Sequence, residues 1–476
     1  MENSRKMEWA MGVLRLVCLL NWCIGGCALA SAPTINELMA SLSAHHPKIM
    51  ELEAEGFQRQ FARDAASAAF DVQLEQDSMV RASGYYDGFM LTQRVVKPLP
   101  FGNAKLKAEY RYADGRFPVY EAEYDSLSGG EASLGIGMSL LRDRNIDKKR
   151  MAISDAEISL NEWQATQEAI RNQLYYNGMM TYLAWYEAHL ALSVYESLVT
   201  TTRNRRKAIA TRVDAGDLAA IALTEFDATV MGRELALQAA KQKAEQSRLK
   251  LSFYLRNRQF EPVEIETLAS VPSDIQWPWG IDEGAIQDFH RTLQAHPLLK
   301  EMRFKQRLAE NKVVLAENTL LPALNIEAKL ARDLGRGPKS LQQTETQIGL
   351  QFSMPLGRRQ AKAELGSAAQ KVNALRYRYQ AVEEALERDL AIASRNWHYN
   401  KQIASMQDKQ AQLAESLFEQ EKKRFNIGAS DLFMLNSREA SAINSRLSAV
   451  KAHIDVLRAS LEVVFSAGEV STYFKG

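Results

Sequence analysis

The sequence RFNIGASDL at residues 424–432 is the one interruption in a very long helical pattern. Gly428 is the only glycine between residues 367 and 467, and no proline occurs in that span. Glycine adopts the left-handed backbone conformation that ends a helix at little cost. A short polar side chain just behind it, Ser430 or Asp431, can accept hydrogen bonds from the N–H groups that open the next helix. The stretch therefore predicts the tip of a helical hairpin with arms longer than an ordinary globular helix.

A second occurrence of this pattern lies upstream, in the sequence RVDAGDL at residues 212–218. Gly216 and Gly428 are 212 residues apart, and each follows an arginine by four positions. The chain is therefore predicted to contain two helical hairpins that arose by duplication. The first arm, from about Ile146 to Val213, contains one glycine, Gly178.

The arm that returns from Gly428 carries a regular apolar stripe. Its residues alternate in steps of four and three, at Ile443, Leu447, Val450, Ile454, Leu457, Leu461 and Val464. This heptad spacing keeps one side of the helix facing a neighbour. A second row, Ala442, Ala449, Val456 and Val463, lies beside it. Two rows favour contacts with more than one helix, as in a closed wall of helices, and an ordinary coiled-coil hairpin is the alternative.

Charge and cysteine content exclude several classes of protein. The chain has 59 basic and 58 acidic residues, so we expect neither a nucleic-acid partner nor a polybasic membrane patch. All three cysteines, Cys18, Cys23 and Cys27, lie in the first thirty residues. The rest of the chain therefore has no disulfide framework and no thiolate metal site.

The N-terminus, residues 1–30, has the pattern of a secretory signal peptide. Basic residues precede an apolar run at residues 16–24, and small residues follow it. Cleavage after Ala30 would release a chain that begins at Ser31. The sequence IGGC at residues 24–27 instead resembles a bacterial lipobox, which would leave a lipid on Cys27. No later stretch approaches the roughly twenty apolar residues of a spanning helix, so a membrane span would have to be a barrel.

Two His-Pro pairs, His46-Pro47 and His296-Pro297, occupy corresponding places in the two halves. Proline disfavours the helical conformation in the residue before it, so each pair predicts a bend that opens a helix. Neither histidine has a partner at ligand spacing, and we predict no metal or cofactor.

Period-two alternation predicts two strands in each half of the chain. They lie near residues 72–75 and 134–140 in the first half, and near 321–328 and 347–354 in the second. The first pair is farther apart by about 38 residues, which lie in a Tyr- and Gly-rich region. Such alternation is typical of barrel strands, and a small soluble hairpin is the alternative.

The same features occur twice, in the same order. Each half has a helix that starts at a His-Pro pair, then two strands, then two long helical arms joined at a glycine tip. In this order, after an export signal, the chain resembles the TolC family of outer-membrane efflux proteins over nearly its whole length. The resemblance implies a mixed fold of long α-helical hairpins and transmembrane β-barrel strands. It implies a trimer in which each protomer gives four strands to one shared barrel. The implied partners are a periplasmic adaptor, an inner-membrane pump and outer-membrane lipid.

The predicted organisation has four parts. Residues 1–30 are the signal peptide, 31–260 form the first repeat with its tip at Gly216, and 261–282 connect the repeats. Residues 283–476 form the second repeat. Some family members carry paired aspartates six and nine residues after the second tip glycine, but Met434 and Ser437 stand there. Two acids of the first repeat, Glu225 and Asp227, are expected on a solvated helix face.

No catalytic motif emerges from the sequence, so an enzyme is not expected. We expect a passive outer-membrane conduit that completes an efflux or type I secretion system and exports small molecules or proteins. The alternative is a periplasmic coiled-coil adaptor or structural protein. The predicted adaptor-docking residues at the two tips are Arg212, Gly216, Asp217, Arg424, Gly428 and Asp431. The arginines could instead only complement the helix dipole, which contributes about 0.3–1 kcal/mol.

Overall fold

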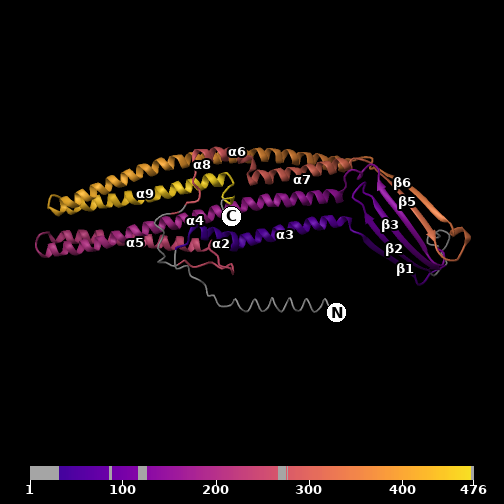
Figure 1. Ribbon diagram of the computed structural model, residues 1–476, viewed down its shortest axis with the longest axis horizontal. Coiled ribbons are helices and arrows are strands. Elements are labelled where there is room, and N and C mark those ends of the chain that lie inside the picture. The colour runs from indigo at the N-terminus through magenta and orange to yellow at the C-terminus, as the bar shows by residue number, and fades with distance from the viewer. Residues whose placement is uncertain (1–31, 85–87, 116–125, 266–274, 276, 473–476) are drawn as a thin grey trace. The chain divides into compact units, whose positions relative to one another are not determined.

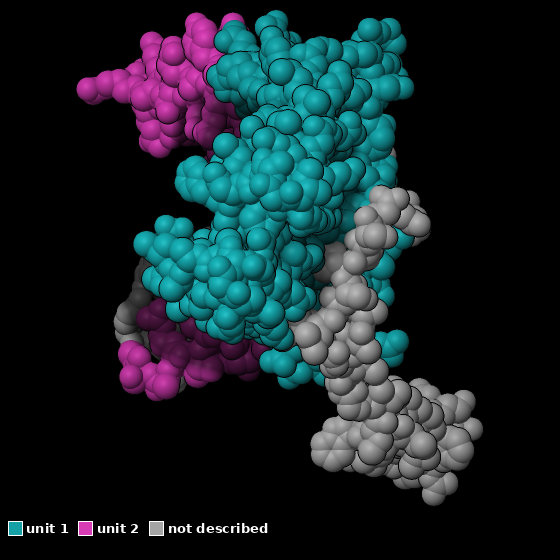
Figure 2. Space-filling view, turned by 90° about the vertical axis from the view of Figure 1, so that its left-hand side faces the viewer, with its two compact units in different colours: residues 1–52, 168–296, 384–476 teal, residues 53–167, 297–383 magenta. Residues whose placement is uncertain are grey.

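The computed structural model describes residues 32–84, 88–115, 126–265, 275 and 277–472. The chain divides into two compact units, coloured teal and magenta in Figure 2. Unit 1 comprises residues 1–52, 168–296 and 384–476, and unit 2 comprises residues 53–167 and 297–383. Each unit therefore takes segments from both halves of the chain. The predicted signal peptide, with Cys27, lies outside the described residues.

The described part of unit 2 contains an antiparallel sheet of six strands in the order β1-β2-β3-β4-β5-β6 (Figure 1). Every strand pairs only with its neighbours in chain order. The strands are β1 (Gln73–Arg81), β2 (Gly88–Pro98), β3 (Lys105–Gly115), β4 (Glu131–Ser139), β5 (Ala323–Asp333) and β6 (Thr344–Ser353).

The prediction of four strands is wrong. Strands β2 and β3 form a hairpin inside the Tyr- and Gly-rich insert of the first half. Their alternation is visible in the sequence, but charged residues stand at positions 105, 107, 109 and 111 of β3, and such a segment resembles a polar loop when its partner strand is unknown.

Two helical hairpins dominate the chain. The first consists of α4 (Lys148–Asp214) and α5 (Ala220–Ser252), and the second of α8 (Arg359–Asn426) and α9 (Leu432–Ser466). Helices α4 and α8 have 67 and 68 residues, against an average of about 11–12 in globular proteins. At 1.5 Å per residue each is about 100 Å long. No helix in the described part of the chain is both long enough and apolar enough to cross a membrane.

The His-Pro pairs open helices as predicted. His46 ends α2 (Ile35–His45) in extended conformation with ψ 126°, and α3 (Pro47–Ser67) begins at the following proline. The second pair does the same between η3 (Leu293–Ala295) and α7 (Pro297–Thr319). The remaining short elements are η1 (Ala68–Phe70), α6 (Glu283–Thr292) and η4 (Lys339–Leu341).

Unit 1 has an apolar core where α2, α4 and α9 meet the segments after α5. Its largest buried side chains are Trp185, Trp279 and Tyr182. The indole N–H of Trp277 donates to the hydroxyl of Ser460 on α9 at 2.8 Å and so attaches the connector to this core. At Gly178 a Cβ atom would come within 2.7 Å of the buried Leu42, because α2 packs closely on α4 at this point.

The predicted heptad stripe on α9 is buried unevenly. Towards the core Ile454, Leu461 and Val464 are buried, but towards the tip the buried row is Leu435, Glu439, Ala442, Ser445 and Ala449. Ile443, Leu447 and Val450 are only partly buried there. Small residues in the tip-side row allow the neighbouring helices to pack closely.

Candidate functional site: a two-faced sheet and two helical tips

The six-stranded sheet has one apolar face and one charged face. On the apolar face, the register aligns Leu74, Val95, Ala108, Leu134 and Leu330 in one row across β1 to β5. Exposed apolar side chains cover this face. They include Leu74, Val80, Val95, Leu106, Tyr110, Leu134, Ile136, Leu330, Ile348, Leu350 and Phe352. A soluble antiparallel sheet normally packs its apolar face on a core, and this one leaves it exposed.

The opposite, charged face carries ion pairs that cross the strands. Arg94 of β2 bridges Glu75 of β1 at 3.1 Å and Glu109 of β3 at 2.6 Å. Glu131 of β4 accepts from Arg111 at 2.5 Å and from Lys329 at 2.9 Å. These pairs tie β1 to β5 side by side, and they gather charge on the face opposite the apolar one.

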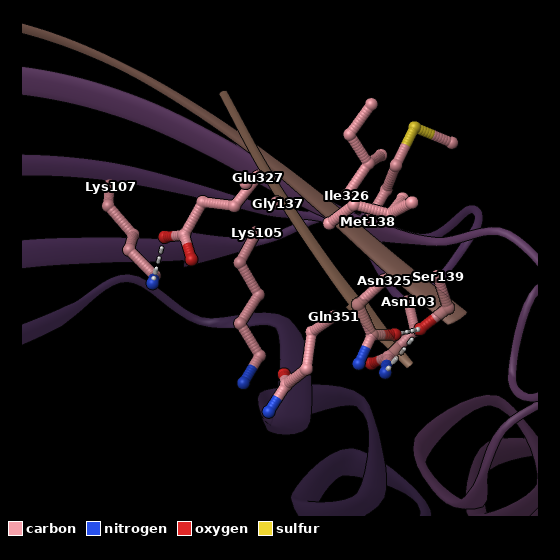
Figure 3. A pocket seen from close by; sticks show the side chains of 12 residues that line it. Asn103, Lys105, Lys107, Gly137, Met138, Ser139, Asn325, Ile326, Glu327 and Gln351 are labelled. Atoms are coloured by element: carbon pink, nitrogen blue, oxygen red, sulfur yellow. Dashed lines mark hydrogen bonds and ion pairs between the residues drawn. The ribbon is translucent and has the colours of Figure 1, made fainter. Parts of the chain in front are cut away.

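A polar hollow of about 380 Å³ lies on the charged face near the helix end of the sheet (Figure 3). Lys107 pairs with Glu327 at 2.6 Å on one side of it. On the other side, Ser139 donates to the side-chain oxygen of Asn325 at 3.0 Å. Polar lining of this kind suits water and mixed solutes rather than one shaped ligand.

Helices α4 and α8 end at their tips in the same way. Gly216 and Gly428 have φ of +81° and +76°, the left-handed conformation predicted for them. The N–H of Asp217 donates to the carbonyl of Arg212 at 2.9 Å, and the N–H of Ala429 donates to that of Arg424 at 2.8 Å. This is the Schellman arrangement, in which the carbonyl four residues before the glycine accepts the closing bond. The backbones of both arginines therefore belong to the turn itself.

The tips differ where the second helix begins. Asp431 is the N-cap of α9, and its carboxylate accepts from the N–H of Met434 at 2.7 Å. At the corresponding place before α5 stands Ala219, which has no side-chain cap. The prediction that Ser430 or Asp431 caps the returning helix is confirmed for Asp431. Ser430 instead donates to Glu421.

The arginine side chains are held within the tip region. Arg424 donates to the carbonyl of Ala429 at 3.2 Å and pairs with Glu421 at 3.3 Å. Arg212 lies over the ring of Phe425 with its guanidinium carbon 5.7 Å from the ring centre. Each arginine thus has a structural role beyond complementing the helix dipole, and Arg212 links one tip to the other.

Apolar side chains are exposed beside the second tip. Ile427 and Phe433 have relative exposures of 80% and 79%. Nothing lies within 4 Å of a Cβ built at Gly216 or Gly428, so the backbone of both tips is open to solvent. Both side chains, and the open backbone beside them, are therefore accessible to a partner.

A buried carboxylate joins the two hairpins near the tips, and the sequence did not lead us to predict it. Glu439 of α9 has a side chain only 5% exposed. The two terminal nitrogens of the Arg205 guanidinium on α4, Nη1 and Nη2, donate to it at 2.7 and 2.8 Å, and a guanidinium nitrogen of Arg233 on α5 lies 2.6 Å away. Arg233 also donates to Thr202. One feature of the sequence could have indicated a buried ion pair. Glu439 stands in the buried row between Leu435 and Ala442, where an unpaired charge would be unstable.

The environment of Glu439 keeps it ionised. Burial alone would raise the pKa of this carboxyl, but the hydrogen bonds and charges of Arg205 and Arg233 outweigh burial and lower it. The cluster is therefore a permanent ion triad at neutral pH. It connects α4, α5 and α9 within unit 1.

The two acids expected on a solvated helix face, Asp227 and Glu225, have different surroundings. Asp227 pairs with Arg206 through oxygen–nitrogen distances of 2.5 and 3.0 Å on a half-exposed surface, and this hydrogen bond lowers the pKa of Asp227. Glu225 is exposed, as expected for a solvated face. No group of three or more histidine, cysteine or acidic residues within the described ranges could hold a metal ion.

Residues 289–469 match the family model described as outer membrane efflux protein. No curated protein matches the sequence. The structure is similar to the outer-membrane channel OprN, with a TM-score of 0.67 at 14% identity over 92% of this chain and 90% of that chain.

Two further solved structures have the same fold. The Campylobacter jejuni CmeC outer membrane channel gives a TM-score of 0.64 at 13% identity, over 93% of this chain and 88% of that one. The outer membrane protein VceC from Vibrio cholerae gives 0.64 at 14% identity, over 91% and 96%. At these identities the likeness is one of fold, and it extends over nearly the whole chain.

Proposed function

We propose that this chain, which carries an outer membrane efflux protein domain at residues 289–469 and the fold of TolC-like channels, is the outer-membrane conduit of an export system. The observation that carries the proposal is the two-faced sheet. Its apolar face is exposed, and its charged residues lie on the opposite face. Such a sheet is stable where lipid covers one face and water the other. The conduit is passive and non-enzymatic, and an inner-membrane pump supplies the energy.

Three copies assemble around one channel in this proposal. Strands β1 and β6 are the edges of the sheet among the described residues, and unpaired strand edges are not tolerated in lipid. Helix α8 also exposes a heptad stripe of Tyr399, Ile403, Met406, Leu413 and Leu417. Helix α5 exposes another, with Ile221, Met231, Leu235 and Leu249. Stripes with this spacing are suited to helices of a neighbouring copy.

The helical tips are the docking surface for a periplasmic adaptor in this proposal. The open glycine turns and the exposed Ile427 and Phe433 support it. The residues involved are Arg212, Gly216, Asp217, Arg424, Gly428 and Asp431. The proposed cargo is small molecules or proteins.

Cell fractionation with gel migration before and after heating tests the proposal as a whole. We expect the protein in the outer membrane as a heat-sensitive oligomer, whose migration changes when the sheet unfolds. A folded monomer in the soluble periplasmic fraction would contradict it and would favour the adaptor alternative.

The variant Gly428→Trp tests the docking surface separately. A side chain on a left-handed backbone costs roughly 1–2 kcal/mol, which is small beside the packing of the long arms. The trimer should therefore still form, while cross-linking to the adaptor and export are lost. Undiminished cross-linking would show that the tip is only a turn. Gly366→Trp is the matched control, since it lies on α8 with equally open surroundings.

The mass of the mature chain tests the processing site. A lipid on Cys27 follows from the lipobox, and Cys27→Ala then abolishes it. Cleavage after Ala30 instead gives an unmodified chain that begins at Ser31.

A further inference from the structure

We propose that the β2–β3 hairpin is part of the membrane-spanning sheet, so that three copies close a barrel of about eighteen strands rather than twelve. This inference rests on the proposed function. It concerns what the insert of the first half does, and it changes the width of the channel at the membrane.

The lengths of the inserted strands match those of the other four. Strands β2 and β3 have 11 residues each, against 9 for β1 and β4, 11 for β5 and 10 for β6. A transmembrane strand needs about 9–11 residues. All six strands are therefore long enough to cross the same apolar layer.

The inserted strands also keep the two faces of the sheet. In β3, Leu106, Ala108 and Tyr110 point to the apolar face and are exposed, while Lys107 and Glu109 alternate with them. In the apolar row that crosses β1 to β5, the inserted Val95 and Ala108 lie between Leu74 of β1 and Leu134 of β4. A hairpin that projected into water would have no reason to continue this apolar row.

On the charged face the hairpin supplies the central links. Arg94 of β2 pairs with both Glu75 and Glu109, and Arg111 of β3 pairs with Glu131. These contacts bind the hairpin to β1 on one side and to β4 on the other. The hairpin is thus an internal part of the sheet.

The ends of the hairpin also suit a membrane barrel. The turn between β2 and β3 lies at the helix end of the sheet and is short, with the N–H of Leu99 donating to Ala104 at 2.8 Å. The N–H of Ser139 on β4 donates to the carbonyl of Gly102 in this turn at 2.8 Å. At the opposite end Phe89 and Tyr112 lie on the apolar face with ring centres 6.3 Å apart. Short turns at one end and aromatic residues near a membrane boundary are typical of such barrels.

Closure follows from the strand order. An even number of up-and-down strands leaves β1 and β6 antiparallel, so β6 of one copy can pair with β1 of the next. With strands about 4.8 Å apart and tilted about 40°, eighteen strands give a backbone diameter of about 36 Å, and twelve give about 24 Å. The wider opening would admit correspondingly larger cargo at the membrane.

The test is site-directed spin labelling of the trimer in lipid vesicles. Single cysteines are placed at residues 106–110 of β3 and, as the reference, at residues 328–330 of β5, in a chain without Cys18, Cys23 and Cys27. Collision rates with oxygen, which enriches in lipid, and with a water-soluble nickel complex report the surroundings of each label. We expect both strands to alternate with period two, with lipid contact at 106, 108 and 110 as at 328 and 330.

Water contact at every β3 position, with alternation kept in β5, would overturn this inference and leave the proposed function intact. Loss of alternation in β3 and in β5 would overturn this inference and the proposed function together. A second measurement does not depend on lipid. Gln76 and Gln93 face each other across β1 and β2 with a 3.0 Å hydrogen bond, so a Gln76→Cys/Gln93→Cys pair should cross-link within one chain in the native trimer. Absence of this cross-link would also count against the inference.

Discussion

Replacing Glu439 with glutamine is predicted to loosen the part of α9 nearest the tip. Glutamine has nearly the same shape, but it leaves the guanidinium groups of Arg205 and Arg233 without their shared counter-ion. The carboxylate is only 5% exposed, so water can compensate little. Breaking a buried ion pair by removing one partner costs roughly 3–5 kcal/mol.

Amide hydrogen exchange of α9 is the suitable assay, because it reports local opening and does not require the trimer to unfold. If this whole cost lowers the free energy of local opening, amides between residues 435 and 449 should exchange roughly 150- to 5,000-fold faster. Asp227→Asn is the matched control. Asp227 occupies the corresponding position 212 residues earlier and pairs with Arg206 at the surface, so its loss should change exchange little.

Equal exchange rates in the two variants would refute the reasoning, since burial would then not distinguish the two ion pairs. A compensating triple variant sharpens the result. With Arg205→Met and Arg233→Leu added to Glu439→Leu, apolar packing replaces the triad, and protection should recover, because such replacements are often neutral or stabilising.

Three further predictions concern caps, packing and pH. Asp431→Ala should destabilise the start of α9 by about 0.5–2 kcal/mol, and Ala219→Asp should stabilise the start of α5 by a similar amount; exchange of the first-turn amides measures both, and no change in either would exclude a capping role. Gly178→Ala should lower the melting temperature because its Cβ would press on the buried Leu42, whereas Gly232→Ala, in open surroundings on α5, should not lower it. The pKa of Glu439 is lowered in the folded chain, so its stabilising contribution is present above its usual pKa of 4.5 and is lost as pH falls below that value through the folded pKa. The difference in melting temperature between wild type and Glu439→Gln should therefore be constant from pH 6 to 8 and shrink below pH 4.5. A difference that grows as the pH falls would contradict the predicted direction.

The elements governed by local chemistry were predictable from the sequence. A glycine that must adopt positive φ and an acid three residues behind it determine the second tip without any distant contact, and the His-Pro bends depend only on the steric effect of proline. Strands β2 and β3 were not predicted because their charged positions become meaningful only when β1 and β4 lie beside them. The same applies to Glu439, whose partners on α4 and α5 are more than 200 residues away in the chain.

The order of the sheet has a consequence for how the chain folds. Most strand pairings join neighbours across a loop, as where Pro98 of β2 opposes Lys105 of β3. The pairing of β4 with β5 is different, because Ser139 opposes Asn325 across the whole first helical hairpin, the connector and helices α6 and α7. Each doubling of a closed loop adds about 0.6 kcal/mol of entropy cost, and this loop is almost thirty times longer, which amounts to roughly 3 kcal/mol. The β1–β4 meander can therefore form early by local zipping, while the β4–β5 seam forms late, and until then the chain exposes two additional strand edges that are prone to aggregate.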